Sequence, residues 1–191
     1  MLNKVCNKIQ SRKTSNDIIY TPKPVALDMI NICKITADMK VLDPSRGGGI
    51  FYNNLPPCIK SYCEIQENKD FFEFKEKQDL IIGNPPYSLW DKWIDHTCTL
   101  TDKFCYIFGI LNLRPNRIDY LQKKGYGITY LKIIQIDWWF GASFIVIFEK
   151  NKKSIIDYTR DRILCDICNK RCKRGLTKDG KKYGMNECSN N

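Results

Sequence analysis

The sequence is short of histidine and of long apolar runs. Its single histidine, His96, excludes metal and catalytic sites that need two histidines. No apolar run approaches the roughly 20 residues of a membrane span. The first residues alternate polar and apolar types and lack the apolar core of a signal peptide. We therefore expect an intracellular protein, in the cytoplasm or in a nuclear or viral compartment, that is neither secreted nor held by a membrane.

Acidic residues are scarce relative to basic ones. The chain of 191 residues has 31 Lys and Arg against 21 Asp and Glu, which gives a formal net charge of +10. This excess favours a polyanionic partner, nucleic acid before an anionic membrane surface. A solvated basic surface without a partner is the alternative. Eleven basic and five acidic residues lie from Asn151 onward, so the end of the chain carries +6 of the charge.

The middle of the chain alternates strand-like and helix-like segments. A hydrophobic fraction of 43% is enough for a packed core. We expect a flexible arm over residues 1–17, a globular domain over 18–150 and a basic, cysteine-rich tail over 151–191. The alternation within the domain is typical of a mostly parallel α/β sheet. Strands are expected at residues 40–43, 59–65, 79–83, 104–113, 128–137 and 142–149, the last two forming a closing antiparallel hairpin.

One apolar strand, residues 79–83, ends in Asn84-Pro85-Pro86-Tyr87. The two prolines lack an N–H and fix φ, so the strand opens into a rigid loop that projects Asn84 and Tyr87. In open α/β sheets, ligands bind at this carboxyl end of the strands. An amide beside an aromatic ring suits a planar group that carries an NH₂. The alternative is an ordinary Asn-Pro turn after a buried strand.

Two polar motifs precede this loop. In Tyr20-Thr21-Pro22, Thr21 is placed to cap a helix whose first turn contains prolines. The strand ending in Asp43-Pro44 runs through Ser45 and Arg46 into Gly47-Gly48-Gly49. Three glycines after a strand allow a tight turn and a close approach of the backbone to a ligand. They form neither a P-loop nor the dinucleotide fingerprint.

Two acids follow the glycines. Glu64 lies near the end of the next strand, where nucleotide sites carry the acid that binds ribose hydroxyls. A solvated strand-end Glu is the alternative for this residue. Asp70-Phe71 then sets an acid beside an aromatic ring, shortly before the strand that leads to Asn84.

In this order the motifs resemble the DNA adenine-N6 methyltransferases, an amino-group methyltransferase family with an Asn-Pro-Pro-Tyr motif that uses S-adenosylmethionine (SAM). The resemblance spans about residues 18 to 149. It implies a Rossmann-like fold with a mostly parallel seven-stranded sheet and a closing hairpin. It also implies that the target base is flipped out of its helix. Arg46 departs from the family pattern, which favours a small residue there.

The resemblance also assigns roles to residues. The catalytic loop is Asn84, Pro85, Pro86 and Tyr87, in which Asn84 and the Pro85 carbonyl accept hydrogen bonds from the target amino group. The residues that it places around the cofactor are Tyr20, Thr21, Pro22, Asp43, Pro44, Gly47, Gly49, Glu64, Asp70, Phe71 and Asn84. Tyr87 stacks on the target base, and Trp138, Trp139 and Phe140 form a second aromatic wall; hairpin core is the alternative for these three.

Only 42 residues follow Glu149, too few for the recognition domain that this family carries. Target selection then falls to loops or to a partner protein. DNA is favoured over RNA as the substrate. A protein glutamine methyltransferase, which uses the same loop to hold an amide nitrogen, is an alternative. A weakly active, nucleic-acid-binding subunit of a larger methyltransferase complex is another.

Four of the ten cysteines lie in the last 27 residues: Cys165, Cys168, Cys172 and Cys188. In a reducing compartment such cysteines are thiols or metal ligands, because disulfides are rare there. The spacing of the first pair is typical of a zinc knuckle, and the intervening Lys and Arg suit phosphate contacts. The spacing of Cys168 and Cys172, with three residues between them, is not that of the usual second pair of zinc ligands. A four-thiolate Zn²⁺ site and a disordered basic tail therefore both stay open.

Overall fold

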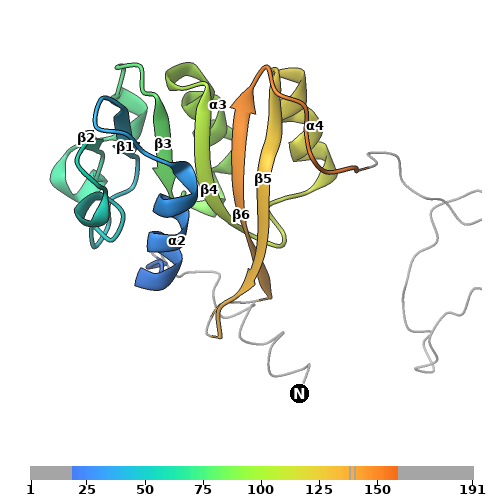
Figure 1. Ribbon diagram of the computed structural model, residues 1–191, viewed down its shortest axis with the longest axis horizontal. Helices are drawn as coiled ribbons and strands as arrows, with labels where there is room; N and C mark the ends of the chain where they lie inside the picture. Colours follow the sequence, from blue (N-terminus) through green and yellow to red (C-terminus); the bar gives the residue numbers. More distant parts are fainter. Residues whose placement is uncertain (1–18, 138, 140, 159–191) are drawn as a thin grey trace, which may run out of the picture. The chain divides into compact units, whose positions relative to one another are not determined.

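The computed structural model describes residues 19–137, 139 and 141–158. A compact unit that ends at Asp157 holds the fold. A six-stranded sheet runs through it in the order β2-β1-β3-β4-β6-β5 (Figure 1). The strands are β1 (Lys40–Asp43), β2 (Ile59–Tyr62), β3 (Leu80–Gly83), β4 (Lys103–Gly109), β5 (Tyr126–Gln135) and β6 (Ala142–Lys150).

The sheet is parallel on one side and antiparallel on the other. β1 pairs in parallel with β2 and β3, and β3 with β4. β6 runs antiparallel to both β4 and β5, so the last two strands form the expected hairpin at one end of the sheet. The mixed α/β architecture predicted from the sequence is therefore confirmed.

The expectation of a seventh strand is wrong for the part of the chain that the structure describes. Between β2 and β3 the chain forms two three-ten helices, Ile65–Glu67 and Phe71–Glu73. Each begins at an acid whose carboxylate accepts a main-chain N–H two residues on: Gln66 N for Glu64 and Phe72 N for Asp70. Such local hydrogen bonds compete with strand pairing. The same cap ends β2 at Tyr62, earlier than predicted.

Three α-helices cover the sheet: α2 (Lys23–Cys33), α3 (Trp90–Leu100) and α4 (Pro115–Lys123). Prolines stand in the first turn of α2 and of α4, where a missing N–H costs nothing. Two further three-ten helices are Tyr52–Asn54 and Tyr87–Leu89. No helix in the described ranges is long and apolar enough to cross a membrane.

The helices lie on opposite faces of the sheet, with α2 in front of it in Figure 1. Successive strand residues point to opposite faces. One core cluster joins α2 residues such as Met29 to Leu80, Ile82 and Ile107. On the other face, Trp93 of α3 donates its indole N–H to the Tyr106 hydroxyl at 3.3 Å. Both faces of the central strands are therefore buried, which explains their uninterrupted apolar sequences.

The compact unit continues past β6. Asn151 N donates to Gly125 O at 2.7 Å, and Ile155 N donates to Ile128 O at 2.9 Å. The Ser154 hydroxyl accepts from Ile128 N at 3.0 Å. Residues 151–155, which the sequence analysis assigned to the tail, are thus hydrogen-bonded to β5 and to the turn before it.

Candidate active site

A cavity of about 440 Å³ lies at the carboxyl end of the parallel strands. Nine residues predicted for the site line it: Tyr20, Thr21, Pro44, Gly47, Glu64, Asp70, Phe71, Asn84 and Pro86. They come from five segments that are far apart in the sequence. The parallel sheet brings these segments together because each one follows a strand or precedes the first helix.

The segment before α2 forms one wall of the cavity. Helix α2 begins after Pro22, which has no side-chain cap, so the prediction that Thr21 caps the helix is wrong. Instead the Thr21 hydroxyl is buried and has no hydrogen-bond partner among the described residues. The Tyr20 ring lies over the glycine loop, and a Cβ added at Gly48 would be 3.4 Å from it.

The glycine loop depends on positive φ angles at Gly47 and Gly49. Gly47 N donates to a Glu64 carboxylate oxygen at 2.6 Å, which ties the loop to the end of β2. Gly49 does not line the cavity; a Cβ there would lie 2.7 Å from Asn53 Nδ2. The loop therefore uses Gly49 for its own close packing, while Gly47 and Gly48 face the cavity.

Asp43 is fully buried behind this loop rather than in the cavity wall. Its carboxylate accepts hydrogen bonds from Ser45 N at 3.3 Å and Tyr52 N at 3.2 Å. Burial raises the pKa of Asp43 to about 7, although these two donors and Arg46 favour the anion. Both of these hydrogen bonds are with the loop backbone, so Asp43 holds the loop in place and does not line the cavity.

The lining also includes the two predicted acids and an aromatic pair. Glu64 and Asp70 both line the cavity, and each uses a carboxylate oxygen to cap a three-ten helix. Phe71 is buried against Trp93 of α3, with ring centroids 4.4 Å apart. Acids beside a flat apolar surface can hold a nucleoside, whose hydroxyl and amino groups donate while its ring packs.

Asn84 borders the cavity at the end of β3. Its Nδ2 donates to the main-chain carbonyl of Ile19 at 2.9 Å. Its Oδ1 is buried and has no hydrogen-bond partner in the described ranges. The Asn84 carbonyl accepts from the Ser45 hydroxyl at 3.1 Å, which joins this loop to the one after β1.

The remaining loop residues do not line the cavity. Pro85 is buried, and the half-buried Tyr87 donates its hydroxyl to Ile107 O on β4 at 3.2 Å. Trp139 is half-buried and packs against the core cluster of the α2 face. Its indole N–H is buried without a partner among described residues. The stacking roles of Tyr87 and Trp139 stay predictions.

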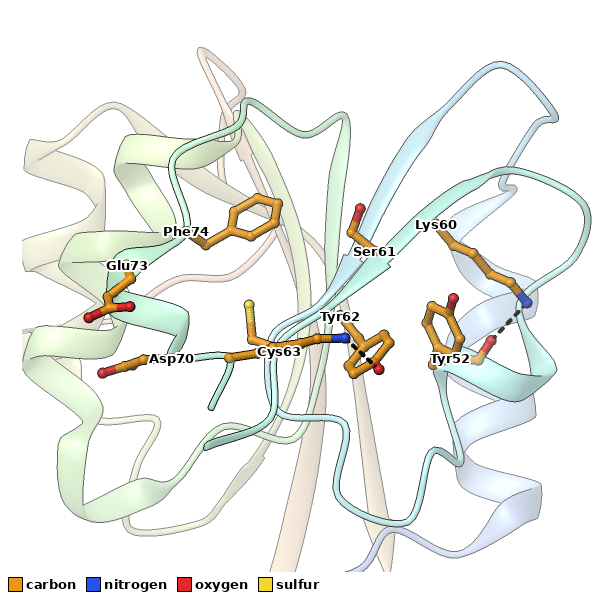
Figure 2. A pocket seen from close by; sticks show the side chains of 9 residues that line it. Tyr52, Lys60, Ser61, Tyr62, Cys63, Asp70, Glu73 and Phe74 are labelled. Carbon is orange, nitrogen blue, oxygen red and sulfur yellow. Dashed lines mark hydrogen bonds between the residues drawn. The ribbon is translucent and has the colours of Figure 1, made fainter. Parts of the chain in front are cut away.

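The large side chain of Arg46, next to the glycines of the loop, is held by an ion pair and a ring contact. Its guanidinium forms an ion pair with Glu67 at 2.5 Å and lies 4.6 Å from the centroid of the Tyr62 ring. Tyr62 also lines a second cavity, of about 430 Å³, along β2 (Figure 2). Lys60 lies over the ring of Tyr52 at 4.8 Å in that cavity. Cations and tyrosines therefore stack along this strand.

Several predicted residues lie outside the described ranges: Trp138, Phe140, Cys165, Cys168, Cys172 and Cys188. Of the predicted cofactor residues, Pro22, Asp43 and Gly49 adjoin the cavity-lining segments without lining the cavity. Ile19 and Trp93 also line the cavity and were not among the predicted site residues. No sequence signal shows that Ile19 reaches the end of β3.

The residues present fit a nucleoside with a polar chain, as in SAM. The cavity has the size of a small-molecule site. One of its buried oxygens, Thr21 Oγ1, finds no partner among the described residues, and the unpaired Asn84 Oδ1 is left for a second ligand. An unpaired buried polar group costs about 1–3 kcal/mol, which a donor on a ligand would remove. Glu64 and Asp70 add acceptors to the lining, and Gly47 and Gly48 add main-chain groups.

No protein-family model matches the sequence, and no curated protein does. Solved structures do match. The 23S rRNA methyltransferase ErmE has 12% identity and a TM-score of 0.55, over 74% of this chain and 73% of that one. The magnesium protoporphyrin IX methyltransferase ChlM of Synechocystis PCC 6803, with bound SAM, has 13% identity and a TM-score of 0.52, over 75% and 91%.

Trm5 of Methanocaldococcus jannaschii, in complex with adenosine, is also similar, with 15% identity and a TM-score of 0.56. The match covers 72% of this chain and 52% of Trm5, so the chain spans about half of that protein. The chain therefore has the Rossmann-like fold of SAM-dependent methyltransferases. At these identities the likeness shows the fold and leaves the substrate open.

Proposed function

We propose that the protein is a SAM-dependent methyltransferase that methylates the N6 amino group of adenine in nucleic acid, with DNA favoured over RNA. The observation that carries the proposal is the Asn84 amide, whose unpartnered Oδ1 borders a cavity that fits SAM. The fold shared with solved methyltransferases supports the reaction class.

The walls of the cavity have distinct tasks in this proposal. Glu64 accepts from the ribose hydroxyls, Asp70 from the adenine amino group of the cofactor, and Phe71 packs against its ring. Thr21 and the glycine loop hold the amino-acid end. When bound, SAM supplies a methyl group on a cationic sulfur, and its C–S bond breaks as the new C–N bond forms. Orientation of the reacting atoms in line supplies most of the rate enhancement.

Asn84 acts on the nucleophile. The lone pair of an aromatic amine is delocalised into its ring, which makes the nitrogen a weak nucleophile. An N–H bond donated to Asn84 Oδ1, with the second donated to the Pro85 carbonyl, favours a more tetrahedral nitrogen. Its lone pair then points at the methyl group. The extra proton leaves the nitrogen for water after the transfer, so a carboxylate at position 84 is not required.

The net positive charge supports a nucleic-acid substrate, and most of this charge lies at the two ends of the sequence. Residues 1–18 carry +3 and residues 159–191 carry +5 of the net charge of +10. The domain between them is nearly neutral. Attraction to phosphates therefore comes from the two flanking segments. Base flipping by the domain, with Tyr87 as a stacking face, completes the proposal. A partner protein would supply target recognition.

RNA is the second candidate substrate, favoured by the similarity to ErmE and by the chemistry of the adenine amino group, which is the same in RNA and DNA. The 2′-hydroxyl is what distinguishes the two nucleic acids. Parallel assays on single-stranded DNA and RNA of one sequence decide between them.

The test of the proposed role is Asn84→Ala, compared with Asn31→Ala, which changes an exposed asparagine on α2. We expect Asn84→Ala to lower kcat by at least 100-fold, because losing a positioned acceptor costs about 3 kcal/mol in the transition state. The SAM dissociation constant, measured by calorimetry, should stay within about threefold. Asn31→Ala should behave as wild type. Equal kcat in Asn84→Ala and wild type would refute the role.

A further inference from the structure

The N-terminal segment touches the proposed catalytic amide directly. Asn84 Nδ2 lies 2.9 Å from the Ile19 carbonyl oxygen, across 65 residues of sequence. A carbonyl oxygen can only accept a hydrogen bond. The amide group that faces Ile19 must therefore be the NH₂. A half-turn of the amide would set two acceptors against each other, so the contact fixes which side of Asn84 carries the oxygen.

The oxygen of the Asn84 amide, which does not face Ile19, is the acceptor that the proposed reaction needs. Asn84 Oδ1 is buried and unpartnered among the described residues, and Asn84 lines the cavity. Because the buried atom of Asn84 that lacks a partner is an acceptor, the site satisfies a substrate that brings an N–H donor. A ring carbonyl in the same place would leave two acceptors unpaired. A site that is built to pair with a donor strongly rejects analogues without that donor.

The same short segment also contacts the cofactor side. Ile19, Tyr20 and Thr21 all line the cavity, and Tyr20 packs over Gly48. Thr21 contributes the second unpartnered buried oxygen. Residues 19–21 therefore link the glycine loop, the cavity and the amide.

We propose that the Ile19 main-chain carbonyl is a positioning group that orients the Asn84 amide and thereby selects an amino group as the methyl acceptor. This inference rests on the proposed function, since the acceptor oxygen of the Asn84 amide has a task when the methyl acceptor carries an N–H donor. Ile19 itself acts through Asn84 and does not touch the reacting atoms.

The pH profile of Asn84→Asp tests the contact. In this variant an ionised carboxylate would face the Ile19 carbonyl with an oxygen that cannot donate, whereas the protonated acid donates to it and keeps its other oxygen as the acceptor. The carbonyl therefore raises the pKa of the new carboxyl. We expect the ratio of kcat for Asn84→Asp to wild-type kcat to fall with pH, up to about tenfold per unit above that pKa. A ratio that is constant or rises with pH would overturn the proposal.

Two truncations test the carbonyl without changing Asn84. A chain that begins Met-Tyr20 keeps a main-chain carbonyl at position 19, supplied by the new methionine. A chain that begins Met-Thr21 has none. We expect the first chain to keep the hydrogen bond, and the second chain to lose both the bond and at least tenfold in kcat. Because the second chain also lacks the Tyr20 ring that packs over Gly48, its kcat is compared with that of full-length Tyr20→Met, which keeps the Ile19 carbonyl. Equal kcat in the two truncated chains would contradict the inference.

A spectroscopic readout separates this inference from the proposed function. The Asn84 side-chain NH₂ signals in a ¹⁵N–¹H spectrum are identified by their loss in Asn84→Asp. One of the two protons should exchange slowly with water in the Met-Tyr20 chain and rapidly in the Met-Thr21 chain. This result would stand even if no nucleic acid were methylated. Equal, fast exchange in both would refute the positioning role even in an active enzyme.

Discussion

The buried carboxyl of Asp43 makes the stability of the domain depend on pH. Burial raises its pKa to about 7 in the folded protein, whereas an aspartate in an unfolded chain has a pKa of about 3.9. Between these values the folded state binds the proton more tightly than the unfolded state does. The free energy of unfolding therefore falls as pH rises from about 4 to about 7, and the loss is complete above the folded pKa.

The size of this effect follows from the shift. The slope is at most about 1.4 kcal/mol per pH unit, and the total at most about 4 kcal/mol. Asp43→Asn removes the titration. It also leaves one of the Ser45 and Tyr52 N–H groups unpaired, because the amide offers one acceptor where the carboxylate offers two. That cost is about 1–3 kcal/mol at every pH.

Urea unfolding of wild type and Asp43→Asn at pH 5, 6, 7 and 8, followed by tryptophan fluorescence, measures both terms. The wild type should be clearly more stable than the variant at pH 5, and its advantage should shrink or reverse by pH 8. Asp38→Asn, which changes an exposed aspartate, is the control and should leave the slope unchanged. A wild-type advantage that stays constant from pH 5 to pH 8 would refute the reasoning.

Three further predictions concern the glycine loop and the cavity. Gly49→Ala should lower the free energy of unfolding by about 1–3 kcal/mol, because Gly49 has a φ of +77° and Asn53 Nδ2 lies 2.7 Å from the new Cβ; unchanged urea midpoints would contradict this. Thr21→Val should weaken SAM binding in calorimetry about five- to tenfold yet stabilise the free protein, since it removes an unpaired buried hydroxyl, and Thr21→Ser should do neither. Glu64→Gln should weaken SAM binding about 10- to 100-fold, the cost of a lost charge-assisted hydrogen bond, and an unaltered dissociation constant would exclude Glu64 from the site.

The parts of the fold that could be predicted are those that follow from local pattern. Each strand of the sheet was predicted from an apolar run that ends near Gly, Pro or an acid. Glu64, Asp70 and Asn84, which the order of the motifs assigned to one site, line one cavity. The prediction succeeded because a parallel sheet collects the ends of its strands at one edge, whatever the loops do.

Other features depend on contacts between distant residues, which local pattern does not contain. Thr21 looks like a helix cap, but the helix starts at Lys23 and the hydroxyl faces inward. The second strand was expected to run to residue 65, but it ends at Tyr62, and the side chains of Glu64 and Asp70 cap two short helices after it. Ile19 lies next to Asn84, and no periodic pattern in the residues before Thr21 predicts this contact.

The central claim is tested most directly by incubating the full chain with SAM carrying a labelled methyl group and with DNA, RNA and protein in parallel. Digestion of each product to nucleosides or peptides then locates the label. We expect label on the N6 nitrogen of adenine in nucleic acid, with loss of that label in Asn84→Ala. Label on protein glutamine, or none in any substrate while SAM binds to the protein, would contradict it.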